Sequence, residues 1–390
     1  MSALPASARA QLTREDELHW LALKLVPGLG PRKAAQVLER FRTPQAAFRA
    51  SRSELVACGL SGSTAQTIAS GCTFEDAVDQ QQKMLNCGAT IVAISDPRYP
   101  PLMREIYDPP LLLFARGKLD LLATVMLGVV GTRRPSPYGI ATSQRLSADL
   151  GQAGITIVSG MARGIDTAAH RSVLGVGGDT VAVFGCGVDV VYPAENRALA
   201  AEIASKGLLL SEFPMGAPGH PQNFPVRNRI ISGMSVGVLI VEGAQYSGSA
   251  ITARMALEQQ REVFAVPGNI TNKMSWGPNL LIKQGAKLVQ DWNDVVMELP
   301  PDSRRRLIDK AQGRLFGDAV PNGLDDPNAA LSATSRDLLS TLKVDASIQL
   351  DQLLESLERY STSELIAALF ELEINGLVRQ LPGKNFVKVW

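Results

Sequence analysis

Short apolar runs that do not alternate with polar residues recur between residues 123 and 291, and helical segments separate them. The runs are TVMLGVVG, ITIVSG, TVAVFGCG, GLLLSEF, VGVLIVEG and EVFAVPG, with a shorter AKLV that includes Lys287. Strands that are apolar on both sides must be covered on both sides, which is typical of parallel sheets flanked by helices. The sequence therefore predicts an open, doubly wound α/β sheet.

The segments on either side of this core follow other patterns, and no internal repeat is evident. Residues 14 to about 90 are predicted to form short helices, and the proline-rich connector at 96–117 is predicted to be extended. Residues 300–330 mix Pro, Gly, Asp and Arg without periodicity, which indicates a linker. The last segment contains three helical stretches and a predicted hairpin, the outline of a winged helix. We expect domain boundaries at 1–95, 96–299, 300–330 and 331–390.

Charge is nearly balanced overall but not locally. The chain has 39 Lys and Arg against 38 Asp and Glu, a net charge of +1, so it is not a uniformly basic nucleic-acid coat. Residues 128–290 contain 14 basic and 10 acidic residues (14 − 10 = +4), whereas residues 331–390 contain 6 and 8 (6 − 8 = −2). A winged helix that reads DNA normally carries excess positive charge. We therefore expect a protein contact or an accessory role for the last segment, and a local phosphate-binding patch on the core.

Cysteine and histidine positions argue against a metal site. None of the cysteines form a C-x-x-C pair, and neither they nor the histidines have zinc-ligand spacing; they are Cys58, Cys72, Cys87, Cys186, His19, His170 and His220. Sparse cysteine suits reduced thiols, so we expect a cytoplasmic protein without a metal or cofactor. No apolar run reaches the roughly 18 residues of a membrane span, and the first twenty residues lack a signal-peptide core. We expect no membrane association.

The first predicted strand of the core ends in Gly131-Thr132-Arg133-Arg134. Ligands of open α/β sheets bind beyond the carboxyl ends of the strands. A dinucleotide-binding turn needs G-x-G-x-x-G, and this turn offers only Gly128 and Gly131 followed by two arginines. Guanidinium groups hold phosphate oxygens, so the turn favours one phosphate or a run of phosphates. The alternative is that both arginines are solvated surface charges.

The second strand is followed by Ser159-Gly160-Met161-Ala162-Arg163-Gly164-Ile165-Asp166, with His170 one helical turn later. Glycines that flank a turn expose backbone N–H groups, as an anion-binding nest requires. Asp166 and His170 could together perform acid–base chemistry, but no Ser or Cys nucleophile accompanies them. We favour a helix-capping aspartate with a histidine that faces its own helix.

Two further clusters offer groups suited to nucleic acid. Phe224, Arg227, Asn228 and Arg229 combine a stacking face, two guanidinium forks and an amide, which is typical of proteins that bind single strands. The alternative makes Phe224 a core residue and at least one of the arginines a buried ion-pair partner. In the other cluster, hydroxyl residues surround a glycine at a predicted helix start, another anion-accepting terminus; its members are Tyr246, Ser247, Gly248 and Ser249.

The ordered set VVGTRRPSPYG, IVSGMARGIDTAAH, TVAVFGCGVDVVYPAENRAL, LLSEFPMG, NFPVRNRIISGMS, VLIVEGAQYSGSAITARMALE and VFAVPGNI resembles the DNA-processing protein DprA (Smf) family. The resemblance extends back through RYPPLMREIYDPPLLLFARG and forward to ELEINGLVRQLPGKNFVKVW, which is similar to the family's winged-helix-like domain. The N-terminal helices resemble a sterile-alpha-motif (SAM)-like domain, and VPGLGPRKAAQVL also resembles a helix-hairpin-helix (HhH).

This resemblance implies an extended Rossmann-like core that binds single-stranded DNA without catalysing a reaction. It implies a homodimer that protects incoming DNA and loads RecA recombinase onto it, in natural transformation, competence and homologous recombination. Arg133 would grip phosphate, Ser159 and Gly160 would offer donors, and Phe224 would stack on a base. The DNA-binding residues implied by the motifs are Gly131, Thr132, Arg133, Ser159, Gly160, Arg163, Gly164, Phe224, Arg227, Asn228, Arg229, Ser247, Gly248 and Ser249.

Two other functions compete with DNA binding. The core also resembles nucleotide-processing phosphoribohydrolases, which use a P-G-G-x-G-T turn followed by a carboxylate. The corresponding stretch here, residues 246–254, lacks the double glycine and the carboxylate, and Glu258 comes a turn later. The second competitor is an adaptor whose loops only shape a dimer interface. We expect a protein that is not an enzyme.

Overall fold

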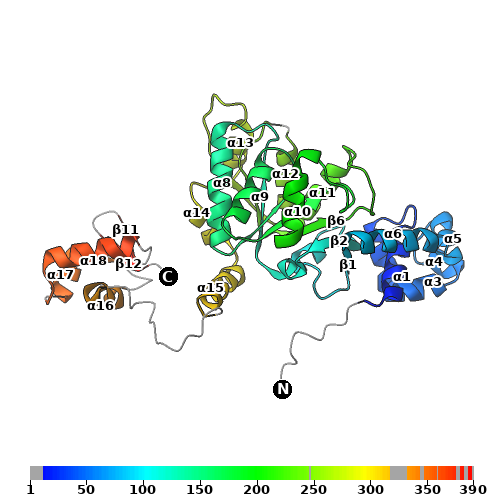
Figure 1. Cartoon of the computed structure of the whole chain (residues 1–390), viewed down its shortest axis with the longest axis horizontal. Coiled ribbons are helices and arrows are strands. Elements are labelled where there is room, and N and C mark those ends of the chain that lie inside the picture. Colours follow the sequence, from blue (N-terminus) through cyan, green and yellow to red (C-terminus); the bar gives the residue numbers. More distant parts are fainter. Residues whose placement is uncertain are drawn as a thin grey trace, which may run out of the picture. The chain divides into compact units, whose positions relative to one another are not determined.

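The computed structural model (Figure 1) describes residues 12–245, 247–316, 332–342, 347–357, 359–374, 378–381 and 385–388. The chain divides into two compact units, residues 1–317 and residues 318–390. The first unit holds the helical region and the large sheet, and the second is a small domain of helices and strands. Among the described residues, no helix is both long and apolar enough to cross a bilayer.

The first unit is built on a nine-stranded sheet in the order β1-β2-β6-β5-β4-β3-β7-β8-β9. From β6 to β9 in this order, neighbouring strands are parallel. Every predicted apolar run forms one of these strands, which are β3 (Met126–Val130), β4 (Thr156–Ser159), β5 (Thr180–Phe184), β6 (Leu208–Ser211), β7 (Gly237–Ile240), β8 (Glu262–Ala265) and β9 (Lys287–Leu288). The predicted parallel sheet is confirmed.

Helices cover both faces of this sheet, because successive residues of a strand point to opposite sides. On β3, Leu127 and Val129 share a core cluster with residues of α8 (Pro137–Gln152) and α9 (Ile165–Gly175). Met126 and Val130 share another with residues of α11 (Asn223–Met234) and α12 (Gly248–Glu258). The doubly wound prediction is therefore confirmed. The other helices of the core are α10 (Arg197–Lys206), α13 (Trp276–Lys283) and α14 (Trp292–Glu298).

The proline-rich connector is not simply extended chain. It contains the short helix α7 (Pro101–Arg104) and strand β2 (Leu112–Gly117), which pairs antiparallel with both β6 and β1 (Thr90–Ala93). Residues 90–93, which the sequence pattern placed in the helical domain, thus belong to the sheet. The apolar start of β2 drives this pairing, because Leu112 to Ala115 are fully buried. Pro109 and Pro110 lie before the strand, where a missing N–H costs no ladder bond.

The N-terminal region consists of helices α1 (Arg14–Lys24), α2 (Pro31–Phe41), α3 (Pro44–Arg49), α4 (Arg52–Ala57), α5 (Gly62–Ser70) and α6 (Phe74–Cys87). Two of its turns share a pattern, a glycine with positive φ followed by a leucine. Gly28 (φ +75°) separates α1 from α2, Gly59 (φ +91°) separates α4 from α5, and a leucine follows each glycine. A positive φ is accessible to glycine at little cost. The two hairpins adjoin, since Thr64 Oγ1 donates to Pro27 O at 3.5 Å.

The predicted linker at 300–330 is helical in its first part. Residues 301–316 form α15 (Pro301–Phe316), with a proline at its first position and Leu307 buried against the core cluster of α8 and α9. That burial explains why an aperiodic, polar sequence is helical here: tertiary packing outweighs weak local preference. Residues 317–331 of the predicted linker lie outside the described residues.

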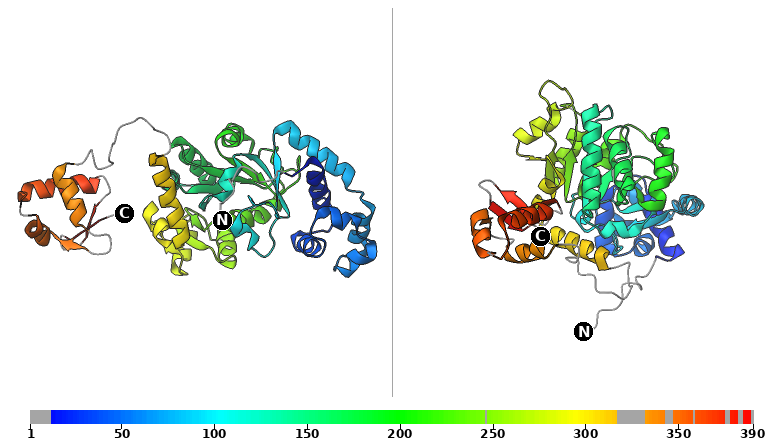
Figure 2. Two further views of the ribbon diagram at one scale, coloured as in Figure 1. Left: turned by 90° about the horizontal axis from the view of Figure 1, so that it is seen from below. Right: turned by 60° about the vertical axis from the view of Figure 1, so that its left-hand side comes forward.

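The second unit has the predicted winged-helix outline (Figure 2). Its described helices are α16 (Ala333–Thr341), α17 (Leu350–Ser356) and α18 (Thr362–Ile374), and its strands are β10 (Ile348–Gln349), β11 (Val378–Leu381) and β12 (Asn385–Lys388). β11 and β12 pair antiparallel, as predicted, and β10 adds a third strand on the other side of β12. Leucines of all three helices form its core.

A chain of charged groups ties α11 to the rest of the first unit. Arg229 is buried and forms ion pairs with Glu212, just after β6, and with Asp108, where Nε and Oδ2 are 3.2 Å apart. The second oxygen of the buried Glu212 side chain lies 3.3 Å from Nζ of Lys24 on α1. Arg229 is therefore the buried ion-pair partner that the alternative interpretation anticipated. In this structure its two ion pairs are with side chains of the protein itself.

We expect Arg229→Gln to lower the free energy of unfolding by about 3 kcal/mol or more, because it leaves the buried Glu212 carboxylate without its main cation. Urea denaturation followed by circular dichroism measures this. Arg145→Gln is the matched control, since its side chain on α8 is 71% exposed and pairs with Asp149 at 3.7 Å; it should change the stability by less than about 0.5 kcal/mol. Equal stability of the two variants would contradict the role assigned to Arg229.

Candidate nucleic-acid interface

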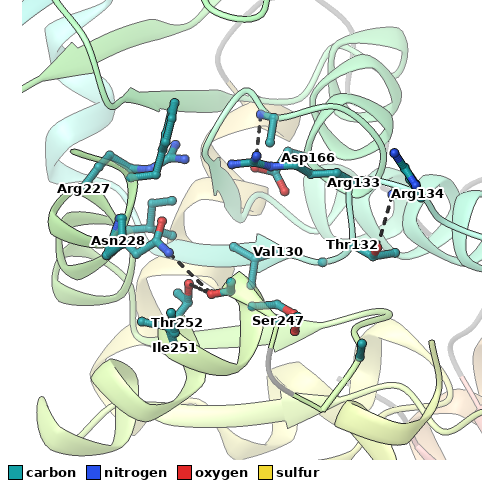
Figure 3. Close-up of a pocket in the computed structure, with 18 of the residues that line it drawn as sticks. Val130, Thr132, Arg133, Arg134, Asp166, Arg227, Asn228, Ser247, Ile251 and Thr252 are labelled. Carbon is teal, nitrogen blue, oxygen red and sulfur yellow. Dashed lines mark hydrogen bonds between the residues drawn. The ribbon is translucent and has the colours of Figure 1, made fainter. Parts of the chain in front are cut away.

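A pocket of about 580 Å³ lies beyond the carboxyl end of β3, between the turn that follows this strand and the first turns of α11 and α12 (Figure 3). Three separate segments build most of it, residues 130–134, 221–231 and 244–252. Of the predicted DNA-binding residues, those that line it are Gly131, Thr132, Arg133, Phe224, Arg227, Asn228, Ser247, Gly248 and Ser249. The structure thus brings together side chains that are more than a hundred residues apart in the sequence.

Glu242 holds the turn after β3 in place. Its backbone carbonyl accepts a hydrogen bond from Thr132 N at 2.7 Å. Its buried carboxylate accepts from Ser136 N at 2.9 Å and Ser136 Oγ at 2.6 Å. Gly131 is required here, because a Cβ at that position would lie 2.5 Å from Ile165 Cγ1. The turn is therefore rigid, and it presents Arg133 from a fixed backbone.

Arg133 is exposed, and within the described part of the chain it forms no ion pair. Its guanidinium carbon lies 5.3 Å from the centroid of the Phe224 ring, within reach of a cation–π contact. This contact orients the group and leaves the N–H fork free of carboxylates. A cation held in this way is well placed to bind a phosphate.

Phe224 occupies a position shaped for its ring. A Cβ at Gly185 would lie 2.8 Å from Cδ1 of Phe224, so only glycine at the end of β5 leaves room for it. The Tyr192 ring lies beside it, with the centroids 5.4 Å apart and the planes 36° apart. Tyr192 also lines the pocket and is 48% exposed. Tyr192 is not among the predicted site residues, although its motif VVYPAEN has an aromatic residue beside a proline.

Arg227 lines the floor of the pocket but is 4% exposed, and its Nη1 donates to the carbonyl of Val183 on β5. Burial lowers the pKa of this guanidinium to about 10, so it remains charged at neutral pH. Burial also raises the pKa of Asp166, against the opposing effect of the Arg227 charge. Figure 3 shows Arg133 and Arg227 reaching towards each other across the site. Arg227 therefore adds positive potential from the floor of the pocket, and its Nη1 is engaged by the protein.

Several predicted binding residues lie elsewhere, and burial is the main reason. Ser159 is fully buried and its Oγ donates to Val129 O at 2.6 Å. Gly160 N donates to Asp166 at 3.0 Å, and a Cβ at Gly160 would collide with the Arg227 guanidinium. In this structure both donors are engaged within the protein, below the pocket, so their binding to DNA stays a prediction.

Arg163, Gly164 and Arg229 are also absent from the lining of the pocket. Arg163 is exposed and forms a bidentate pair with Glu195, at 2.6 and 2.7 Å. Gly164 has a φ of +80°, and a Cβ there would collide with Thr132 O, so it allows the two turns to approach. Arg229 faces Glu212 and Asp108, as described above.

The acid–base pair of Asp166 and His170, the less favoured interpretation, does not form; the favoured capping role is not seen either, since Gly164 is the N-cap residue of α9. The Asp166 carboxylate accepts from the turn before the helix, including Ala162 N at 3.3 Å. The His170 Nδ1 is 2.7 Å from Thr180 Oγ1, and that hydroxyl also donates to Ile157 O at 2.8 Å. Because the hydroxyl has one proton, His170 must donate from Nδ1. Burial lowers the pKa of His170 to about 3, so it is a neutral core residue and no acid–base partner.

The N-terminus of α12 forms the third side of the pocket. Ser247 caps the helix by accepting from Ala250 N at 3.4 Å, and its Oγ lies 2.7 Å from Oγ of Ser249. Asn228 reaches towards this terminus, with Nδ2 3.5 Å from Gly248 O (Figure 3). The partial positive charge of a helix N-terminus favours an anion here. Tyr246, from the same predicted cluster, lies outside the described residues.

Comparison with known proteins connects this architecture to one family. The family described as DNA recombination-mediator protein A matches residues 90–300, and the DprA winged helix domain matches residues 323–384. Protein Smf of Synechocystis sp. is 34% identical over 96% of this chain and 99% of that protein. Protein Smf of Escherichia coli is 40% identical over 73% of this chain and 74% of that protein.

Two solved structures share the fold and more than a quarter of their aligned residues. DNA processing protein A from Streptococcus pneumoniae has a TM-score of 0.60 and 36% identity, covering 74% of this chain and 99% of that chain. DNA processing protein A from Helicobacter pylori has a TM-score of 0.50 and 29% identity, covering 54% of this chain and 97% of that chain. Its structure concerns its single-stranded DNA binding mode. With this core, this second unit and these relatives, the chain belongs to the DprA (Smf) family of DNA recombination-mediator proteins.

Proposed function

We propose that this protein binds single-stranded DNA in the pocket beyond β3, protects it, and helps to load RecA recombinase onto it during natural transformation and homologous recombination. The observation that carries the DNA-binding step is Arg133, a guanidinium that lies over Phe224 in the pocket and forms no ion pair within the described residues. A phosphate gives such a group its missing counter-charge.

The aromatic pair supports a single strand over a duplex. Phe224 and Tyr192 lie side by side in the wall of the pocket, and aromatic rings are the surfaces on which unpaired bases stack. Bases in a duplex are stacked on one another and cannot reach such a surface, whereas those of a single strand can. The relative from Helicobacter pylori, whose structure concerns single-stranded DNA binding, supports the same assignment.

Membership of the family supports the remaining parts of the proposal, which are RecA loading, protection of DNA, a homodimer formed through the Rossmann-like core, and a cytoplasmic location. β9 is the last strand of the sheet, and Leu288 on it is 44% exposed. An exposed edge strand can pair with the same strand of a second copy. The size of the free protein in solution tests the dimer. RecA filament assembly on single-stranded DNA, with and without this protein, tests the loading step.

Arg133→Ala should weaken the binding of a single-stranded oligonucleotide and reduce the slope of log affinity against log salt by about 0.7, the value of one phosphate contact on a single strand. Fluorescence anisotropy at several salt concentrations, with a single strand and its duplex, measures both. Arg145→Ala, which removes an exposed charge outside the pocket, should leave affinity and slope unchanged. A parent protein that shows no salt dependence, or that binds duplex equally well, would overturn the single-strand assignment.

Phe224→Leu should weaken binding by roughly 1–3 kcal/mol, the contribution of one stacked base, while the salt slope stays at the parental value. The slope is unaffected because stacking releases no counterion. Leucine keeps an apolar side chain beside Gly185, and the unfolding midpoint provides the control for folding. Parental affinity in this variant would show that the base lies elsewhere.

The rival function, a phosphoribohydrolase, lacks support at the pocket. Among the described lining residues, Asp166 is the one carboxylate, and it is 5% exposed and occupied by backbone N–H groups. We therefore propose that the protein acts by binding, without catalysis. Incubation with nucleoside monophosphates should release no free base above the background of a heat-denatured sample. Base release that Asp166→Asn abolishes would establish the enzyme instead.

A further inference from the structure

One segment of the chain joins the helical region to the wall of the pocket. It runs from Glu212, at the end of β6, to Phe224, on the first turn of α11. From residue 216 to residue 226 every residue is partly or fully exposed, so the segment has little core of its own. Its position must therefore come from the few residues that anchor it.

The first anchor is the buried Glu212 carboxylate, which two cations from different elements share. Its Oε1 lies 3.3 Å from Nζ of Lys24 on α1, and its Oε2 forms an ion pair with Arg229 on α11. Lys24 is 19% exposed, so this pair is screened less than those on the surface. The helical region thus contributes a charge to the group that positions α11.

The second anchor is the side-chain amide of Gln80, which forms hydrogen bonds with both backbone groups of Met215. Gln80 on α6 is 7% exposed; its Oε1 accepts from Met215 N at 2.7 Å and its Nε2 donates to Met215 O at 3.4 Å. Met215 is itself 3% exposed and belongs to the same apolar cluster as Trp20 and Met84 of the helical region. Removing Gln80 would leave the backbone N–H and C=O of a buried residue without partners, which is costly.

The C-terminal end of the 212–224 segment is held in place beside the pocket. Asn223 Nδ2 donates to Gly185 O at 3.0 Å and to Pro218 O at 3.2 Å, which ties the end of the segment to β5. Pro221 and Phe224 then line the pocket. Phe224, the aromatic residue that we assign to base stacking, follows Met215, the residue that Gln80 holds, by nine positions in the sequence (224 − 215 = 9).

From this arrangement we infer that the helical region sets the geometry of the pocket, with Gln80 and Lys24 as positioning residues, so that docking of this region and binding of single-stranded DNA are energetically coupled. The inference rests on the proposed function of the pocket. Neither residue lines the pocket, so each acts through the 212–224 segment. Coupling of this kind is reciprocal, which means that bound DNA must in turn stabilise the docked helices.

The test compares Gln80→Ala and Lys24→Met with two matched controls on α6. Gln82→Ala removes the same side chain from an exposed site, where its amide donates to Asn86, and Lys83→Met removes an exposed lysine paired with Asp79. Anisotropy with a single-stranded oligonucleotide should show about fivefold weaker binding for the first two variants. The salt slope should stay parental, because no phosphate contact is lost. Both controls should bind like the parent.

A second measurement separates positioning from simple destabilisation. In the parent, single-stranded DNA should slow amide hydrogen exchange in residues 14–24 and 74–87, and this protection should disappear in Gln80→Ala and Lys24→Met. Lys24→Arg keeps the charge beside Glu212 and should restore both affinity and protection. If Gln80→Ala fails to fold, the comparison of Lys24→Met with Lys24→Arg tests the coupling by itself.

The outcomes distinguish the two proposals. Parental affinity in both variants, or exchange in the helices that DNA does not alter, would overturn the coupling while leaving the DNA-binding function intact. A parent protein that does not bind the oligonucleotide would overturn the function itself.

Discussion

Two buried guanidinium groups, two residues apart on α11, hold this helix against the ends of neighbouring strands. Arg227 donates to the carbonyl of Val183 at the end of β5, and Arg229 pairs with Glu212 after β6. A buried guanidinium that loses its partners is strongly destabilising, so these contacts leave α11 little freedom to shift. The position of Phe224, one turn earlier on the helix, depends on both.

The order of the strands explains where the pocket lies. The chain leaves β3 towards β4, β5 and β6, and returns on the other side of β3 as β7. The connections after β3 and β7 therefore diverge, and ligands of open α/β sheets bind at such switch points. Here the turn after β3 supplies Arg133 and the segment after β7 supplies the N-terminus of α12. Both favour an anion, and the buried charge of Arg227 adds to them.

The local pattern of apolar and polar residues predicts much of this architecture. Each apolar run became a parallel strand, the turn from Gly131 to Arg133 lies at the pocket, and the three-helix segment with a hairpin became the second unit. The local sequence pattern did not predict strands β1 and β2. They form an antiparallel pair that adds to the β6 edge of the sheet, and this pairing depends on which edge of the folded sheet is free. Nor did the pattern predict α15, where burial of Leu307 outweighs an aperiodic sequence.

The roles of similar residues were decided by the packing of distant segments. Arg133, Arg227 and Arg229 all occur in short motifs whose sequence suits phosphate binding equally well. In the structure Arg133 is exposed over an aromatic ring, whereas Arg227 and Arg229 are buried. Ser159 has a hydroxyl suited to a ligand, but this hydroxyl donates its hydrogen bond to Val129 O on β3. Residue type and periodicity determine strands, helices and the kinds of groups at strand ends. Which of those groups meets solvent depends on contacts made across the sheet, between residues that no short stretch of sequence contains together.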